Sequence, residues 1–181
     1  SESPLRQTVS EFPLHLDIET STICNLRCPM CPRTYALAKK AFEEAGIMKF
    51  GDFKNIINQG IDGGVYSIKL NYLGEPLLHP DVIKQVKYAK EKGIIDVMFN
   101  TNGVMLSEDL SYALLEAGID KLFLSFDSPY PESYEQIRVG AKISQVLKNI
   151  RTFYNLKPRN YPHVQVRVSM VIMNDEPKVI K

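Results

Sequence analysis

Strand-like and helix-like segments alternate along this chain, and the connections between them are short. Apolar and alternating runs predict five strands, at residues 14–19, 66–71, 95–100, 121–126 and 164–172. Apolar residues at helical spacing predict helices between them, at residues 53–60, 82–89, 110–117 and 146–154. This order is typical of a parallel sheet whose strands are joined by crossover helices. The sequence therefore predicts an α/β fold.

Residues that commonly begin or end helices flank the predicted helices: Asp52, Pro80 with Asp81, Gly93, Ser107, Gly118 and Ser144. The segment 35–49 is rich in Ala, Lys and Glu, so a short surface helix and a solvated loop both fit it, and we favour the helix. No internal repeat or domain linker interrupts the chain. We expect one core domain over residues 14–181, preceded by an N-terminal extension over residues 1–13.

Several predicted strands place polar residues on one side only: Asp17 and Glu19, Lys69 and Asn71, Asn100 and Asn102, Arg167 and Ser169. Strands buried on both faces would instead consist of continuous apolar runs. With helices covering one face of the sheet, the other face becomes a polar concavity. This suits an open, curved barrel that holds a polar ligand in its lumen. A sheet with one solvated face is the alternative.

All three cysteines fall within eight positions, as Cys24, Cys28 and Cys31, directly after the first predicted strand. A structural zinc site or an ordinary iron–sulfur cluster takes four protein ligands. A cubane [4Fe–4S] cluster held by three thiolates leaves one iron open, and an open position is where a metal centre does chemistry. The carboxyl ends of parallel strands are also where active sites form. A zinc site or a purely structural site is the alternative.

Basic and acidic residues are nearly balanced, 22 against 21, with a net charge of +1. This balance does not indicate a nucleic-acid or membrane-surface partner. No apolar run approaches the roughly 18 residues that span a bilayer, and residues 1–11 lack the apolar stretch of a secretory signal. We therefore expect a cytoplasmic protein, in which three clustered cysteines indicate a metal or redox site rather than disulfides.

Three further strands end in short polar motifs: Leu-Gly-Glu-Pro at 73–76, Asn-Thr-Asn-Gly at 100–103 and Ser-Phe-Asp at 125–127. Together with Cys24-x3-Cys28-x2-Cys31, this succession resembles the radical S-adenosylmethionine (radical SAM) superfamily over about residues 14–172. The motifs Cys-Pro-Met-Cys-Pro-Arg and Gly-Glu-Pro-Leu-Leu-His-Pro-Asp are similar to those of members that carry a C-terminal SPASM or twitch domain. The resemblance implies a partial (β/α) barrel, with five βα units visible of an expected six.

The resemblance also implies the cofactors and the reaction. The three cysteines would hold a [4Fe–4S] cluster, and the amino and carboxylate groups of SAM would chelate its fourth iron. An electron from the cluster would cleave the S–C5′ bond and release methionine and a 5′-deoxyadenosyl radical, which abstracts a substrate hydrogen. The electron donor would be a flavodoxin or a ferredoxin.

For the substrate, this similarity favours a peptide or protein side chain, with a sugar-like small molecule second. A different class of protein, a non-catalytic iron–sulfur or zinc-binding scaffold, is the alternative.

By position in the motifs, the residues implied to contact the cofactor are Met30, Gly74, Glu75, Asn100, Asn102, Ser125, Asp127, Arg138 and Ser169. Met30 would touch the adenine, Gly74 and Glu75 would receive the methionyl ammonium, and Arg138 would pair with the carboxylate. The two asparagines would approach the ribose or the substrate. The serine of the fourth strand would approach the ribose or the carboxylate, and Asp127 the substrate.

Two roles remain open for each of two other polar residues. Arg33 could flank the cluster or cap a loop, and Lys69 could contact the substrate or pair with Glu19. We expect His79 to have a structural role at a helix entry and none of the three histidines to bind metal. No cysteine follows Cys31 and the sixth βα unit is missing, so we expect a longer protein with a C-terminal domain. The last visible strand should then expose an apolar sheet edge.

Overall fold

The computed structural model describes residues 12–38 and 46–172. Five parallel strands form one sheet in chain order: β1 (His15–Asp17), β2 (Ser67–Lys69), β3 (Asp96–Thr101), β4 (Lys121–Ser125) and β5 (Gln165–Ser169). Each strand overlaps a predicted one. Right-handed crossovers between strands in chain order place the connecting helices on one face, which is how an open (β/α) barrel is built. The prediction of an α/β fold with five parallel strands is confirmed, and in the described residues a helix follows each of the first four.

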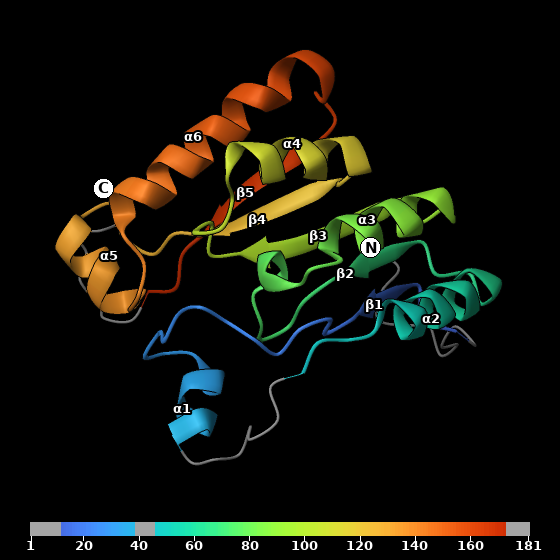
Figure 1. Cartoon of the computed structure of the whole chain (residues 1–181), viewed down its shortest axis with the longest axis horizontal. Helices are drawn as coiled ribbons and strands as arrows, with labels where there is room; N and C mark the ends of the chain where they lie inside the picture. The colour runs from blue at the N-terminus through green and yellow to red at the C-terminus, as the bar shows by residue number, and fades with distance from the viewer. Residues whose placement is uncertain (1–11, 39–45, 173–181) are drawn as a thin grey trace, which may run out of the picture.

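The helices are α1 (Pro32–Ala38), α2 (Phe50–Asp62), α3 (Val82–Glu91), α4 (Glu108–Ala117), α5 (Pro131–Ile137) and α6 (Ile143–Asn160), with a 3-10 turn η2 (Pro76–Leu78). Helices α2, α3, α4 and α6 lie side by side along one face of the sheet (Figure 1). Ser107 and Gly118 delimit α4 as predicted. The Ser107 hydroxyl oxygen accepts the Leu110 N–H at 3.2 Å, and Gly118 has a left-handed φ of 90°.

Two helix starts differ from the prediction. Helix α2 begins at Phe50, so Asp52 lies in its first turn and is not the cap. The Phe50 ring packs on the rings of Phe53 and Tyr88, which stabilises the helical conformation earlier than the cap signal indicates. Helix α6 begins at Ile143, just before the predicted cap.

The segment 35–49 is only partly helical. Helix α1 ends at Ala38, and residues 39–45 lie outside the described residues. Ile47 forms an antiparallel bridge to Ser21, so the end of the segment is extended. Helix α5 had no predicted counterpart, because seven residues are too few to show an apolar period.

The hydrophobic core lies between the helices and one face of the sheet. Its fully buried residues include Phe53, Ile68, Val97, Phe99, Leu114, Leu122, Leu124 and Phe153. Successive strand residues point to opposite faces, so the remaining strand residues belong to the other side. There Asp17, Lys69, Ser125 and Arg167 are half-buried or exposed. The helices thus leave one polar face of the sheet uncovered, as predicted.

Polar side chains link four strands on this uncovered face. Lys121 forms an ion pair with Asp96, and Asp96 accepts a hydrogen bond from the Ser67 hydroxyl at 3.5 Å. The Ser67 oxygen also lies 2.8 Å from Nδ1 of His15. This chain of contacts runs from β1 to β4, so it supports the parallel register of the sheet.

His79 has the structural role that the sequence predicts. Its Nδ1 accepts the Asp81 N–H at 3.0 Å, which leaves the proton on Nε2 to be donated to the Met48 carbonyl oxygen, also at 3.0 Å. The buried ring therefore joins the entry of α3 to the segment before α2.

Strand β5 is an edge strand of the described sheet. Along and after it, Val168, Met170, Val171 and Ile172 are 58%, 41%, 49% and 57% exposed. This apolar edge agrees with the expectation from the sequence.

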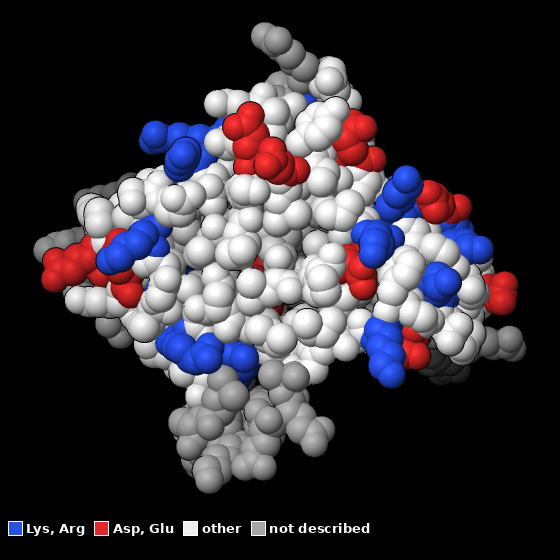
Figure 2. Space-filling model, in the orientation of Figure 1, with Lys and Arg blue, Asp and Glu red and all other residues white. Residues whose placement is uncertain are grey.

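On the face in Figure 2, basic and acidic side chains are interspersed. Among the described residues, no helix has both the length and the apolar character needed to cross a membrane.

Candidate cofactor site

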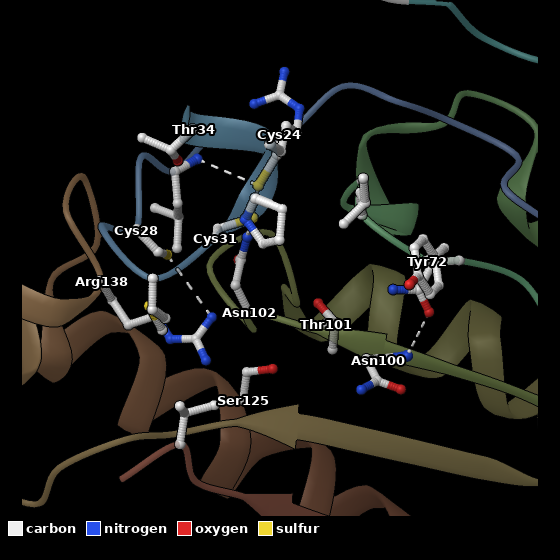
Figure 3. A pocket seen from close by; sticks show the side chains of 18 residues that line it. Cys24, Cys28, Cys31, Thr34, Tyr72, Asn100, Thr101, Asn102, Ser125 and Arg138 are labelled. Atoms are coloured by element: carbon white, nitrogen blue, oxygen red, sulfur yellow. Dashed lines mark hydrogen bonds between the residues drawn. The ribbon is translucent and has the colours of Figure 1, made fainter. Parts of the chain in front are cut away.

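A cavity of about 290 Å³ opens where the carboxyl ends of the strands meet (Figure 3). Parallel strands bring these ends to one edge, so segments far apart in the sequence line the same space. All three cysteines line it. Six of the nine residues implied to contact the cofactor also line it: Met30, Gly74, Asn100, Asn102, Ser125 and Arg138. The structure therefore brings most of the predicted site together.

Three predicted residues lie outside this lining: Glu75, Asp127 and Ser169. Conversely, the cavity includes residues that the sequence did not indicate, among them Thr34, Tyr72 and Val171. Tyr72 directly follows the polar end of the second predicted strand, which is the one signal that could have pointed to it. Val171 lies on the same side of the fifth predicted strand as Arg167 and Ser169, whereas nothing in the sequence pattern marks Thr34.

The Glu75 carboxylate lies behind the cavity wall and is 3% exposed. One oxygen accepts the Thr101 hydroxyl at 2.7 Å and the Leu77 N–H at 3.2 Å, and the other accepts the Asn102 N–H at 2.8 Å. Burial raises the pKa of Glu75, and these donors oppose that effect. Glu75 therefore positions the end of β3 in this structure, with both carboxylate oxygens already bonded.

The Leu-Gly-Glu-Pro motif at residues 73–76 is hydrogen-bonded to the segment that follows β1. The Glu19 carboxylate accepts the backbone N–H groups of Leu73 and Gly74, at 2.5 and 3.1 Å. The Glu75 N–H donates to the carbonyl oxygen of Ile23 at 2.7 Å, one residue before the first cysteine. The Glu19 carboxylate thus binds backbone N–H groups. Among the described residues it forms no ion pair with Lys69, so that interpretation of Lys69 is wrong.

The three cysteines are free thiols. Burial raises the pKa of Cys24 and of Cys28. The Leu26 N–H, 3.5 Å from Cys24 Sγ, and the charge of Arg33 oppose this rise at Cys24. A bound metal ion deprotonates a coordinating thiol outright, so these buried thiols suit metal ligation better than free thiolate chemistry.

Arg138 reaches from the end of α5 to the cysteines (Figure 3). Its Nη1 donates to Cys28 Sγ at 3.8 Å, and its Nε donates to Asp127 in an ion pair. The Asp127 side chain is fully buried, and its second oxygen accepts the Val171 N–H at 2.8 Å. Burial alone lowers the pKa of Arg138, but the bond to Asp127 raises it above its usual range. Arg138 thus stays charged beside Cys28, and Asp127 holds it there.

A test of cofactor fit is provided by Arg33, which is 5% exposed and lines the cavity. Its Nη1 is buried without a hydrogen-bond acceptor in the part of the chain that the structure describes. Three soft thiol donors and an unsatisfied guanidinium N–H fit an anionic iron–sulfur cluster. Within residues 12–38 and 46–172, no three His, Cys, Asp or Glu side chains converge on a position for a single metal ion. A [4Fe–4S] cluster does not require this, because each cysteine binds a different iron.

Fold and cavity together define an open (β/α) domain with a three-cysteine site at the carboxyl ends of its strands. The sequence profile of the Radical SAM superfamily matches residues 18–178. The chain therefore belongs to the radical SAM superfamily, whose members use a [4Fe–4S] cluster and S-adenosylmethionine.

Two curated relatives are named for one reaction. The chain is 30% identical over 148 residues to GTP 3′,8-cyclase of Alkaliphilus metalliredigens, covering 81% of this chain and 45% of that protein. It is 38% identical over 160 residues to the probable GTP 3′,8-cyclase of Methanothermobacter marburgensis, covering 87% and 48%. The chain thus spans less than half the length of either relative.

Among solved structures, SuiB of Streptococcus suis bound to S-adenosylmethionine has the same fold. It superposes with a TM-score of 0.75 over 93% of this chain and 36% of that chain, at 21% identity. This likeness confirms the partial (β/α) barrel.

The Asp127–Arg138 pair yields a stability prediction. Asp127→Ala leaves a buried guanidinium without its counter-ion, so we expect the free energy of unfolding to fall by about 3–5 kcal/mol. Urea unfolding of the cluster-free protein measures this. Lys142→Ala is the control, because Lys142 is 75% exposed in its ion pair with Glu135, and the loss there should stay below about 1 kcal/mol. An equal loss in both variants would contradict the prediction.

Proposed function

We propose that this chain is the cofactor-binding domain of a radical SAM enzyme, which cleaves SAM reductively and removes a hydrogen atom from its substrate. One observation carries the proposal. The three cysteines share a single cavity with Gly74, which follows β2, and with Arg138, which lies at the end of α5, in a chain that belongs to this superfamily.

In this proposal Cys24, Cys28 and Cys31 each hold one iron of a [4Fe–4S] cluster. When bound, a reduced cluster would supply one electron for cleavage of the S–C5′ bond of SAM, which would give methionine and a 5′-deoxyadenosyl radical. The protein supplies orientation and exclusion of solvent. An electron donor such as flavodoxin or ferredoxin is the expected partner.

The chain's own residues orient SAM. The Gly74 carbonyl group offers an acceptor for the ammonium, and Arg138 offers a fork of N–H donors for the carboxylate. Met30 gives an apolar contact for the adenine. Asn102 and Ser125 offer hydrogen-bonding groups to the ribose. Glu75 and Asp127 act from behind the cavity wall, by holding the end of β3 and Arg138 in place.

The substrate would lie on the polar, uncovered face of the sheet beside the cavity. A peptide side chain is the candidate that the sequence motifs favour. A nucleotide is a second candidate, supported by the relatives' name and by two cations on this face. Within the described residues, neither Lys69 nor Arg167 forms an ion pair. The Arg167 guanidinium lies over the Phe123 ring, with its Cζ atom 5.0 Å from the ring centroid. Such cations would favour the phosphates of a nucleotide.

The test is formation of 5′-deoxyadenosine. Protein reconstituted with iron and sulfide without oxygen, then reduced and mixed with SAM, should release 5′-deoxyadenosine and methionine in equal amounts. Addition of GTP or of candidate peptides should raise the rate for the true substrate class. Folded protein that holds about four irons per chain and releases no 5′-deoxyadenosine would contradict the proposal.

A further inference from the structure

Arg33 is a buried cation whose charge is not neutralised by a carboxylate of the described residues. It lies in the first turn of α1, two residues after Cys31, and is 5% exposed. Its Nε donates to the carbonyl oxygen of Thr22 at 2.6 Å. Its Nη1 is equally buried and has no acceptor within residues 12–38 and 46–172. One end of the guanidinium is therefore fixed, and the other has an unused donor.

The second arginine of the cavity has the opposite arrangement. Arg138 is neutralised by Asp127, whose side chain is fully buried beneath it. Burying a guanidinium is unfavourable unless an anion and hydrogen-bond acceptors replace the lost water. Arg138 finds both in the protein, whereas Arg33 finds only a backbone carbonyl group. The net positive charge of this arginine pair thus comes from Arg33.

The missing anion should lie in the cavity itself. Arg33 lines the same space as the three cysteines, and Asn102 and Ser125 on its wall are uncharged. The bond to Thr22 anchors the guanidinium to the segment that leads into the cysteine motif. Because the Arg33 guanidinium is anchored beside three metal-binding thiols, it favours a bound group that brings negative charge into the cavity.

We propose that Arg33 is an anion-binding residue of the cofactor site, which donates to negative charge that the bound cofactors bring into the cavity. This inference rests on the proposed function and assigns Arg33 a role beyond capping a loop. Two groups supply such charge: the thiolate-ligated cluster, which gains a further negative charge on reduction, and the carboxylate of SAM. Both are bound by the same charge-assisted N–H donation.

The experiment compares reconstituted wild-type protein with Arg33→Gln, Arg33→Lys and Arg27→Gln. Arg27 is the matched control, because it lies in the same cysteine motif but is exposed and donates to the backbone carbonyl groups of Cys24 and Leu26. Two quantities are measured without turnover: the midpoint potential of the cluster in the absence of SAM, and the dissociation constant of SAM.

If Arg33 donates to the cluster, Arg33→Gln shifts the midpoint potential to more negative values without SAM, because a cation favours the reduced state. If it donates to the SAM carboxylate, that potential stays and the dissociation constant rises about tenfold or more. Arg33→Lys should fall between wild type and Arg33→Gln in whichever quantity changes, and Arg27→Gln should match wild type.

Both quantities unchanged in a folded, iron-loaded Arg33→Gln protein would overturn the inference while leaving the proposed function intact. A wild-type protein that takes up no cluster would instead count against the proposed function. If Arg33→Gln does not fold, Arg33→Met gives a second neutral variant of similar buried volume for the same two measurements.

Discussion

Cys28→Ala should lose its cluster and keep its fold. We expect iron content to fall from about four atoms per chain to near zero, with loss of the visible absorbance, because only three cysteines are available as ligands. Cys28 belongs to a small apolar cluster with Leu26, Tyr134 and Val146, separate from the main core. Removing one sulfur atom there should cost only about 1 kcal/mol of stability. Iron analysis and circular dichroism measure the two effects.

Ile143→Val is the matched control for this prediction. Ile143 lies in the same small cluster and is 5% exposed, so the change removes a buried carbon from the same environment without touching a sulfur. It should cost about 0.5–1.5 kcal/mol and retain wild-type iron. Wild-type iron in a folded Cys28→Ala protein would mean that the three cysteines are not the ligand set.

Gly74→Ala should damage both the fold and the site. A Cβ atom at Gly74 would lie 1.7 Å from the backbone oxygen of Ser21 and 3.1 Å from that of Ile23. No side chain can move away to relieve this contact, so the backbone that leads to Cys24 must shift. We expect a loss of about 3 kcal/mol or more in the free energy of unfolding, together with reduced cluster uptake. Urea unfolding and iron analysis measure these losses.

Gly51→Ala provides the comparison for this variant. Gly51 lies in α2 with nothing within 4 Å of the added Cβ, so alanine should stabilise the helix by about 0.5–1 kcal/mol. If Gly74→Ala proved as stable as Gly51→Ala, this would contradict the close packing of Gly74 on the backbone of Ser21 and Ile23.

The sequence predicted the sheet well, because side-chain alternation is a local signal. It predicted the start of α2 poorly, because the edge-to-face contact of the Phe50 and Tyr88 rings joins residues far apart in the chain. Helix α5 was missed for a similar reason. Its Tyr134 is buried against Phe126 of another segment, with ring centroids 5.0 Å apart, and no periodic run marks it.

The site was predictable as a set of strand ends and not as a set of side-chain directions. The motifs placed Gly74, Asn102 and Ser125 at one rim, and the structure brings them to one cavity. Spacing alone could not reveal that Glu75 turns behind the wall to bind the end of β3, or that Asp127 binds Arg138. These directions depend on tertiary hydrogen bonds, which sequence position does not encode.

The central claim is that three thiolates leave one iron free for the amino-acid end of SAM. Electron paramagnetic resonance of the reduced, reconstituted protein tests it most directly, with SAM labelled with ¹⁵N at its amino group. We predict that SAM changes the spectrum of the reduced cluster and that the label adds a hyperfine coupling to it. An unchanged spectrum without ¹⁵N coupling at saturating SAM would contradict the account.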